Sequence, residues 1–218
     1  ARQRAEELAI ARDIAEKTAQ ENARMYESEQ SRRQAVELMA SSSRQLSLLS
    51  KMEDVPQQIL EQLSSIAQFD RGVVFLEDVN GVPEVAAHRG LPPNALLSEL
   101  CYATRTDNKS TDMYQAVARM KEPIYIDDVT KIQGWSQPDW LPMDRSWLGL
   151  PLFYKDKMMG MVTLTRSNAS AFTRDDVIVT RAFSVQAAIA LENARLFNDV
   201  TSMNEMMERM VEQRVEEL

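Results

Sequence analysis

Glycine and proline, the residues that most often end helices, are missing from both ends of this chain. Neither occurs in residues 1–53 or in residues 182–218 of the 218-residue sequence. Residues 1–53 are also rich in alanine, glutamate, glutamine, arginine and leucine, which favour helix. This pattern predicts one helix from near residue 2 to near residue 50, about 70 Å long at the standard rise. We expect two long terminal helices that flank a folded body.

Between these helices, two neighbouring apolar runs predict a pair of strands. Trp147–Tyr154 is aromatic and aliphatic, and Met158–Arg166 is rich in residues that favour strands. The polar segment Lys155–Lys157 suits a hairpin turn. Gly160 suits a bulge or a close approach of two backbones. We therefore expect two adjacent antiparallel strands in the middle of a sheet.

A helix is predicted to follow this hairpin. Thr173 is a suitable N-cap, and Asp175 and Asp176 place negative charge at the positive end of the helix dipole. Asp176 stands at the capping-box position, where Glu or Gln is usual. Apolar residues then recur at helical spacing from Val177 to Leu196. Because no breaker follows, we expect this helix to leave the domain without stopping.

Shorter signals complete the predicted body. Pro56 suits the first turn of a helix, and Asn80-Gly81 is a strong hairpin turn. Further strands are expected at 72–76, 85–88 and 124–126, and a short helix at 113–120. Together these elements predict an α+β fold, an α/β sandwich in which an antiparallel sheet of about six strands carries helices on one face.

Several segments together resemble a GAF domain. In chain order they are Pro123–Val129, Arg145–Leu152, Gly160–Leu164, Phe172-Thr173 and Gln186–Leu196. The resemblance is to the GAF domains of bacterial multidomain signalling proteins of the sensor histidine kinase type. It implies a signalling helix at 1–54, a GAF-like sensor domain at 55–197 and an output helix at 198–218.

The resemblance also implies a ligand pocket between the sheet and the helices and loops above it. The candidate lining residues are Phe75, Cys101, Tyr102, Met113, Ile126, Trp135, Trp140, Trp147 and Thr163. All of them could instead fill the core, and for Phe75 and Trp147 we favour that interpretation. Trp135 and Trp140 lie in an irregular loop, where packing alone explains a large aromatic side chain less well.

The sequence gives little indication of the cofactors that known GAF domains bind. The loop 133–146 contains no cysteine, so we do not expect a covalently attached bilin there. The single histidine, His88, ends a predicted strand and is expected to be exposed, which argues against haem. No metal-ligand spacing is present, and Cys101 and His88 lie in separate segments. We expect no metal, no catalytic residue and no enzyme activity, and the identity of any ligand stays open.

Charge and composition limit the kinds of partner that we expect. The formal charge is -8, and phosphate contacts need clustered lysine and arginine, so we expect no nucleic-acid partner. No apolar run reaches the length of a membrane span, so no direct membrane insertion is expected. The single cysteine fits a reducing cytoplasm. Because residue 1 already lies in a predicted helix, we expect a piece of a longer protein with neighbouring signalling domains.

Both terminal helices carry an apolar seam at spacings of three and four residues. The seam residues are Val36, Met39 and Leu46 in the first helix, and Ile189, Leu196, Val200, Met203, Met207 and Met210 in the second. Polar residues interrupt the first seam, which coiled coils tolerate. We expect a parallel coiled-coil homodimer, with a solvated linker helix as the alternative.

Two functions of different classes follow. The first is a sensory or regulatory module that binds a small ligand or serves as a relay. It would pass a conformational signal through dimeric helices to an output domain, expected to be a histidine kinase. The second is a ligand-free module that only dimerises and spaces a coiled-coil rod.

Overall fold

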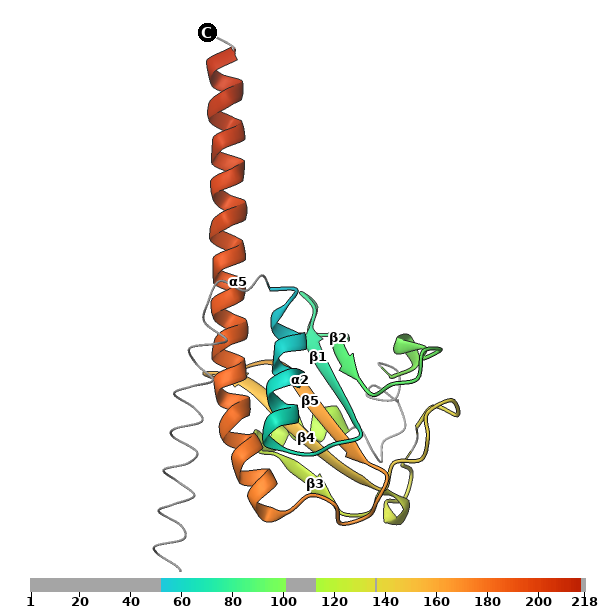
Figure 1. Cartoon of the computed structure of the whole chain (residues 1–218). Coiled ribbons are helices and arrows are strands. Elements are labelled where there is room, and N and C mark those ends of the chain that lie inside the picture. The colour runs from blue at the N-terminus through green and yellow to red at the C-terminus, as the bar shows by residue number, and fades with distance from the viewer. Residues whose placement is uncertain (1–51, 101–112, 136, 217–218) are drawn as a thin grey trace, which may run out of the picture. The chain divides into compact units, whose positions relative to one another are not determined.

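A five-stranded antiparallel sheet forms the centre of the computed structural model, which describes residues 52–100, 113–135 and 137–216. Its strand order is β2-β1-β5-β4-β3, so β5 occupies the middle (Figure 1). The strands are β1 (Arg71–Glu77), β2 (Pro83–Arg89), β3 (Ile124–Ile126), β4 (Ser146–Tyr154) and β5 (Lys157–Arg166). The helices are α2 (Val55–Ile66), α4 (Met113–Met120), the 3-10 turn η1 (Val129–Lys131) and α5 (Arg174–Glu216). The antiparallel sheet is confirmed, with five strands in the described residues where we expected about six.

The predicted hairpin is the β4–β5 pair. Tyr154 pairs with Lys157, which leaves a two-residue turn whose first residue, Lys155, has φ of 53°. Gly160 lies where β5 passes β1, and a Cβ added there would overlap the carbonyl oxygen of Phe75. The close approach expected at this glycine is therefore confirmed, and any larger residue would push the two central strands apart.

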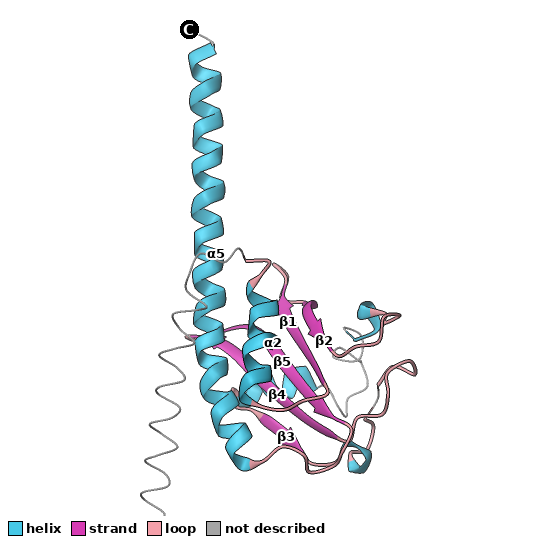
Figure 2. Ribbon diagram, viewed as in Figure 1, coloured by secondary structure: helices cyan, strands magenta, loops and turns pink. Residues whose placement is uncertain are grey.

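Successive residues of a strand point to opposite faces, and here both faces are apolar. One face carries Val74, Leu148, Leu150, Val162 and Leu164, all buried in one core cluster with residues of α2 and α5. Figure 2 shows these two helices lying together across the sheet. At about 1.5–3 kcal/mol for each fully buried aliphatic side chain, this cluster is a main source of stability.

The other face is also covered, which corrects the expectation that all helices lie on one side. Tyr114 and Val117 of α4 are buried in a second cluster with Val73, Phe75 and Trp147. β1 and β5 are buried along nearly their whole length, so both of their faces need apolar partners. α4 and the loop before β4 provide those partners on the second face.

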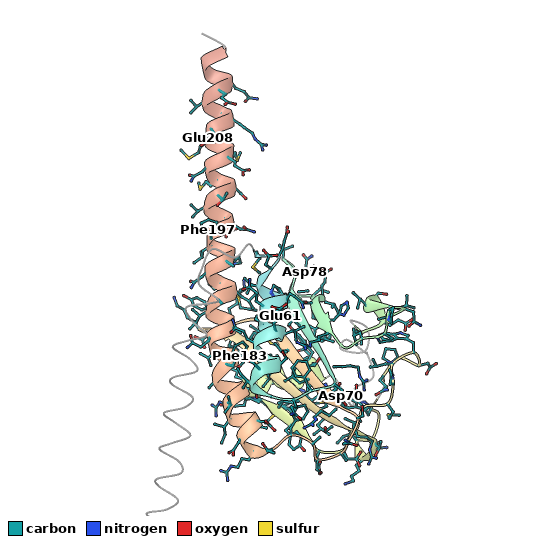
Figure 3. The ribbon with its side chains drawn as sticks, viewed as in Figure 1. Glu61, Asp70, Asp78, Phe183, Phe197 and Glu208 are labelled. Carbon is teal, nitrogen blue, oxygen red and sulfur yellow. The ribbon has the colours of Figure 1, made fainter. Side chains whose placement is uncertain are left out.

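α5 begins as predicted and runs for 43 residues. The backbone N–H of Asp176 donates to Thr173 Oγ1 at 3.1 Å, and Asp176 Oδ2 accepts from the Thr173 backbone N–H at 2.8 Å. This is a capping box closed by aspartate. Figure 3 marks Phe183 where α5 packs on the sheet and Phe197 and Glu208 farther along the same helix. From Phe197 to residue 213 all its side chains are exposed.

The predicted N-terminal helix falls outside the described residues, and so do Val36, Met39 and Leu46 of its seam. Among the helices that the structure describes, none combines the length and the apolar character needed to cross a membrane.

Candidate ligand pocket

A cavity of about 110 Å³ lies on the sheet face opposite α2 and α5. Its floor comes from alternate residues of the two central strands, Arg71, Val73 and Phe75 of β1 and Met161, Thr163 and Thr165 of β5. The two strands pair these residues directly, with Arg71 opposite Thr165, Val73 opposite Thr163 and Phe75 opposite Met161. The antiparallel register therefore builds one mixed floor, apolar at one end and polar at the other.

Trp147 forms a second part of the floor because β4 has no side chain at Gly149. A Cβ added at Gly149 would overlap the six-membered ring of the Trp147 indole. The indole is 6% exposed and packs edge-to-face against Trp135, with ring centroids 6.0 Å apart and an interplanar angle of 74°. Such aromatic pairs add about 0.5–1.5 kcal/mol beyond their burial.

The loop between η1 and β4 forms the opposite wall. Gly134, Trp135, Gln137, Pro138 and Leu141 line the cavity from this loop. Gln137 Nε2 donates to the backbone oxygen of Leu141 at 3.1 Å, which closes the loop on itself. The loop is therefore held by its own hydrogen bonds as well as by the Trp135–Trp147 contact.

A buried ion pair joins the floor to this loop. Arg71 Nη2 donates to Asp144 Oδ1, and the two side chains are only 10% and 4% exposed. Buried pairs add little net stability, because the desolvation of both charges offsets their attraction. Breaking one is costly, since it leaves an uncompensated buried charge. Arg71 and Asp144 thus fix the position of the loop end above β1.

A second ion pair anchors the same loop from its other side. Asp128 Oδ2 accepts from Arg145 Nη2 at 2.6 Å, and Asp128 Oδ1 accepts from Arg145 Nε at 3.0 Å and from Thr130 Oγ1 at 2.7 Å. The Arg145 guanidinium, followed by Thr130, holds the pKa of Asp128 far below its usual range. Asp128 in turn raises the pKa of Arg145. Asp128 also caps η1 through the Thr130 backbone N–H.

The model of the GAF domain family matches residues 51–191, more than half of the chain. This chain belongs to the GAF domain family. A Nif-specific regulatory protein of Rhizobium etli is 24% identical over 143 residues, which cover 62% of this chain and 23% of that protein. The match thus spans about a quarter of that relative's length.

Solved structures agree on the fold. The GAF domain of an Acinetobacter phosphoenolpyruvate-protein phosphotransferase has a TM-score of 0.59 at 14% identity, and the match covers 74% of this chain and 94% of that one. The corresponding domain from Coxiella burnetii has the same score and identity, with 76% and 96% covered. At this level of identity, the similarity establishes a common fold.

Five of the nine predicted pocket residues line the cavity of this GAF domain: Phe75, Met113, Trp135, Trp147 and Thr163. Ile126 does not line it and is buried in the second core cluster, which also contains Val117 of α4 and Val129 of η1. Trp140 does not line it either, since its Nε1 donates to Glu99 Oε2 at 2.6 Å on an exposed side of the loop. Cys101 and Tyr102 lie outside the described residues.

The prediction omitted the charged pair of this GAF domain, Arg71 and Asp144. A period-two pattern could have found Arg71, because it stands two and four residues before Val73 and Phe75 on the same strand face. Asp144 gave no local signal, since its partner is 73 residues away in the chain.

His88 is exposed on β2, as predicted, and the described residues contain no group of three histidine, cysteine or acidic side chains placed to hold a metal ion.

Proposed function

We propose that this GAF domain is a sensory or relay module that binds a small molecule in the cavity and passes a conformational change through α5 to an output domain. The observation that carries the proposal is that the cavity lies on one face of the central strands and α5 packs on the other. Thr163 lines the cavity, while its neighbours Val162 and Leu164 are buried against the helices. A displacement of β5 by a ligand would reach the helix side through adjacent residues.

Such a module signals only if the ligand binds two arrangements of the domain with different affinity. A shift from mostly one state to mostly the other needs about 5.5 kcal/mol of differential binding. Two contacts tie the loop wall to the floor, Arg71–Asp144 and Trp135–Trp147, and we propose that they differ between the two arrangements. Moving the loop therefore changes contacts on β1 and β4 directly.

For the output side we propose a parallel homodimer through α5. Ile189, Leu196, Val200, Met203, Met207 and Met210 are 38–67% exposed on the single chain. They recur at steps of seven, four, three, four and three residues, which is the spacing of a coiled-coil seam. In proteins most of the stability of a helix comes from packing of its apolar face, so an apolar stripe along the free part of α5 favours a partner helix.

We also propose that the output domain is a histidine kinase, because residues 210–218 resemble linkers that precede such domains. The similarity to a Nif-specific regulatory protein is compatible with a regulatory output of another class. We assign no catalytic residue to this domain and propose that it only binds a ligand and relays a signal.

A metabolite screen tests the sensory function. The chain is heated with and without each compound, and the comparison variant is Thr163→Phe, which fills the cavity. A true ligand at a hundred times its Kd stabilises the folded chain by about 2.7 kcal/mol. For a chain of this size, that is a rise in Tm of about 5–10 °C, and Thr163→Phe should abolish it.

The same samples test the relay by hydrogen exchange along α5. If the domain is a sensor, the ligand should change amide hydrogen exchange in residues 189–213 of the wild type. The ligand should cause no such change in Thr163→Phe. Val73→Phe serves as a second blocking variant in case the first does not fold. The ligand-free spacer is the correct function in either of two cases. In the first, no compound raises the Tm of the wild type more than that of both variants. In the second, a compound binds but hydrogen exchange in α5 does not change.

A further inference from the structure

Among the residues that the structure describes, three polar atoms around the cavity are buried without a hydrogen-bond partner. They are Arg71 Nε, Trp135 Nε1 and Thr165 Oγ1, and all three side chains line the cavity. Buried donors are almost always paired, because an unpaired one loses its bonds to water and gains nothing in return. Unpaired groups gathered at one cavity point to a molecule that supplies their partners.

The identity of these atoms defines the chemistry of that molecule. The Nε–H of arginine and the indole N–H can only donate, and a threonine hydroxyl can donate or accept. Two fixed donors and one adaptable hydroxyl call for a ligand with at least two acceptor atoms. A purely apolar ligand would leave all three groups unpaired and would gain only the contact with Val73, Phe75 and Met161.

The charges around the cavity favour an uncharged ligand. Arg71 is already paired with the buried carboxylate of Asp144. The nearby Asp128–Arg145 pair is balanced as well. A bound anion would therefore lie close to the Asp144 carboxylate, and repulsion between buried like charges is strong at low dielectric. A carbonyl or ring nitrogen can accept the same hydrogen bonds without that repulsion.

The volume of the cavity bounds the size of the ligand. Each water-sized group needs about 10–15 Å³ of such space, so a cavity of about 110 Å³ holds roughly seven to eleven of them. This is the size of one substituted ring. Met113 and Met161 are flexible side chains at the cavity and can adapt to small differences in shape.

We propose that the pocket takes a compact, uncharged ring or carbonyl compound whose two or more acceptor atoms pair with Trp135, Arg71 and Thr165. This proposal rests on the proposed function and names its ligand class. The three polar atoms belong to side chains that line the cavity, but the atoms themselves have almost no exposed surface. Binding therefore includes a small movement of the loop that carries Trp135, and that movement changes the contacts of the loop with Trp147 on β4.

Fragment binding followed by NMR tests the ligand class on the full chain. The probes are matched pairs that differ in charge and little in shape: nicotinamide with nicotinate, and pyrazinamide with pyrazinoate. Toluene is the apolar probe. The signals are the indole N–H resonances of Trp135, Trp140 and Trp147, assigned with single Trp→Phe variants. We expect each amide to shift the Trp135 resonance at least tenfold more strongly, at equal concentration, than its carboxylate partner or toluene.

A matched pair of variants tests the role of the Trp135 N–H. Trp135→Phe keeps an aromatic ring and removes the donor, so amide binding should weaken about three- to tenfold. Trp140→Phe removes an N–H that is bonded to Glu99 and should leave the affinity unchanged. Equal effects of the two variants would overturn the role of Trp135.

The other outcomes separate the ligand class from the proposed function. Stronger binding of the carboxylates or of toluene would overturn the ligand class and leave a sensor. The absence of any shift at Trp135 with all five probes would also overturn it, and water would then be the partner of the buried donors. Amide binding that shifts Trp135 but does not alter hydrogen exchange in α5 would support the ligand class and contradict the relay.

Discussion

At the scale of single residues, Asp128 ties together three parts of this GAF domain. It lies after β3, caps η1 through Thr130 and binds Arg145, the residue before β4. Two neighbouring bonds hold the same region, because the backbone N–H of Val129 donates to the Arg145 carbonyl and that of Arg145 to the Arg166 carbonyl. The carboxylate of Asp128 thus keeps the end of the pocket loop in register with the sheet.

Replacing Asp128 with asparagine should destabilise the domain in a pH-dependent way. The pKa of Asp128 in the folded state lies far below the unfolded value of about 3.9. A lowered pKa contributes stability that is fully present above the unfolded pKa and is lost as pH falls toward the folded one. Urea unfolding should therefore show a lower midpoint for Asp128→Asn at pH 7 and a smaller difference from the wild type at pH 3.

The neighbouring residue provides the control for this experiment. Asp127 is exposed, and its backbone oxygen accepts from the Ser170 N–H, a bond that the side chain does not make. Asp127→Asn should therefore change stability by less than about 0.5 kcal/mol at either pH. If Asp128→Asn also proves neutral at pH 7, Asp128 does not hold the loop.

At the scale of elements, the hairpin and α5 could be predicted because their signals are local. The two apolar runs and the polar turn of β4–β5 are adjacent in the sequence, and the two residues of the Thr173–Asp176 cap are three positions apart. The side of the sheet on which α4 packs depends on contacts with residues about 40 positions away, such as Val73 and Phe75. Local sequence gives no information about such contacts, so the second covered face was missed.

Within β4, the Trp147 indole lies over Gly149, so adding a single methyl group at Gly149 should change the stability of the domain. Gly149→Ala should push the indole out of its position and destabilise the domain by about 1–3 kcal/mol, as overpacking does. In most strands the same change is neutral or favourable, because alanine loses less backbone entropy than glycine. Urea unfolding measures the loss, and tryptophan fluorescence should report a more solvated indole.

A double-mutant cycle shows whether Trp147 is the cause. In a Trp147→Leu background the added methyl group meets a smaller side chain, so Gly149→Ala should cost less by at least about 0.5 kcal/mol. An equal cost in both backgrounds would place the strain elsewhere on β4.

At the scale of the whole molecule, α5 carries two apolar faces. Phe183, Ala187 and Leu191 are buried against the body, while Ile178, Val185 and Ile189 are exposed on the same helical segment. The exposed face continues without a break in spacing into Leu196, Val200, Met203, Met207 and Met210. A helix with one buried and one exposed apolar stripe is typical of an element that packs on its own domain and on a second chain.

The dimer that we propose makes a direct prediction for this exposed stripe. Met203→Glu with Met207→Glu places two charges per chain at its centre, so the dimer dissociation constant should rise at least a hundredfold. Each methionine contributes about 1.5–3 kcal/mol when it is buried, and an unpaired carboxylate at that place adds a desolvation penalty. The matched control is Asn198→Glu with Ser202→Glu, which adds the same charge at the same spacing away from the stripe. Sedimentation equilibrium at micromolar concentration should find monomers only for the methionine variant. A wild type that is itself monomeric, or a control variant that dissociates equally, would contradict the stripe as the interface.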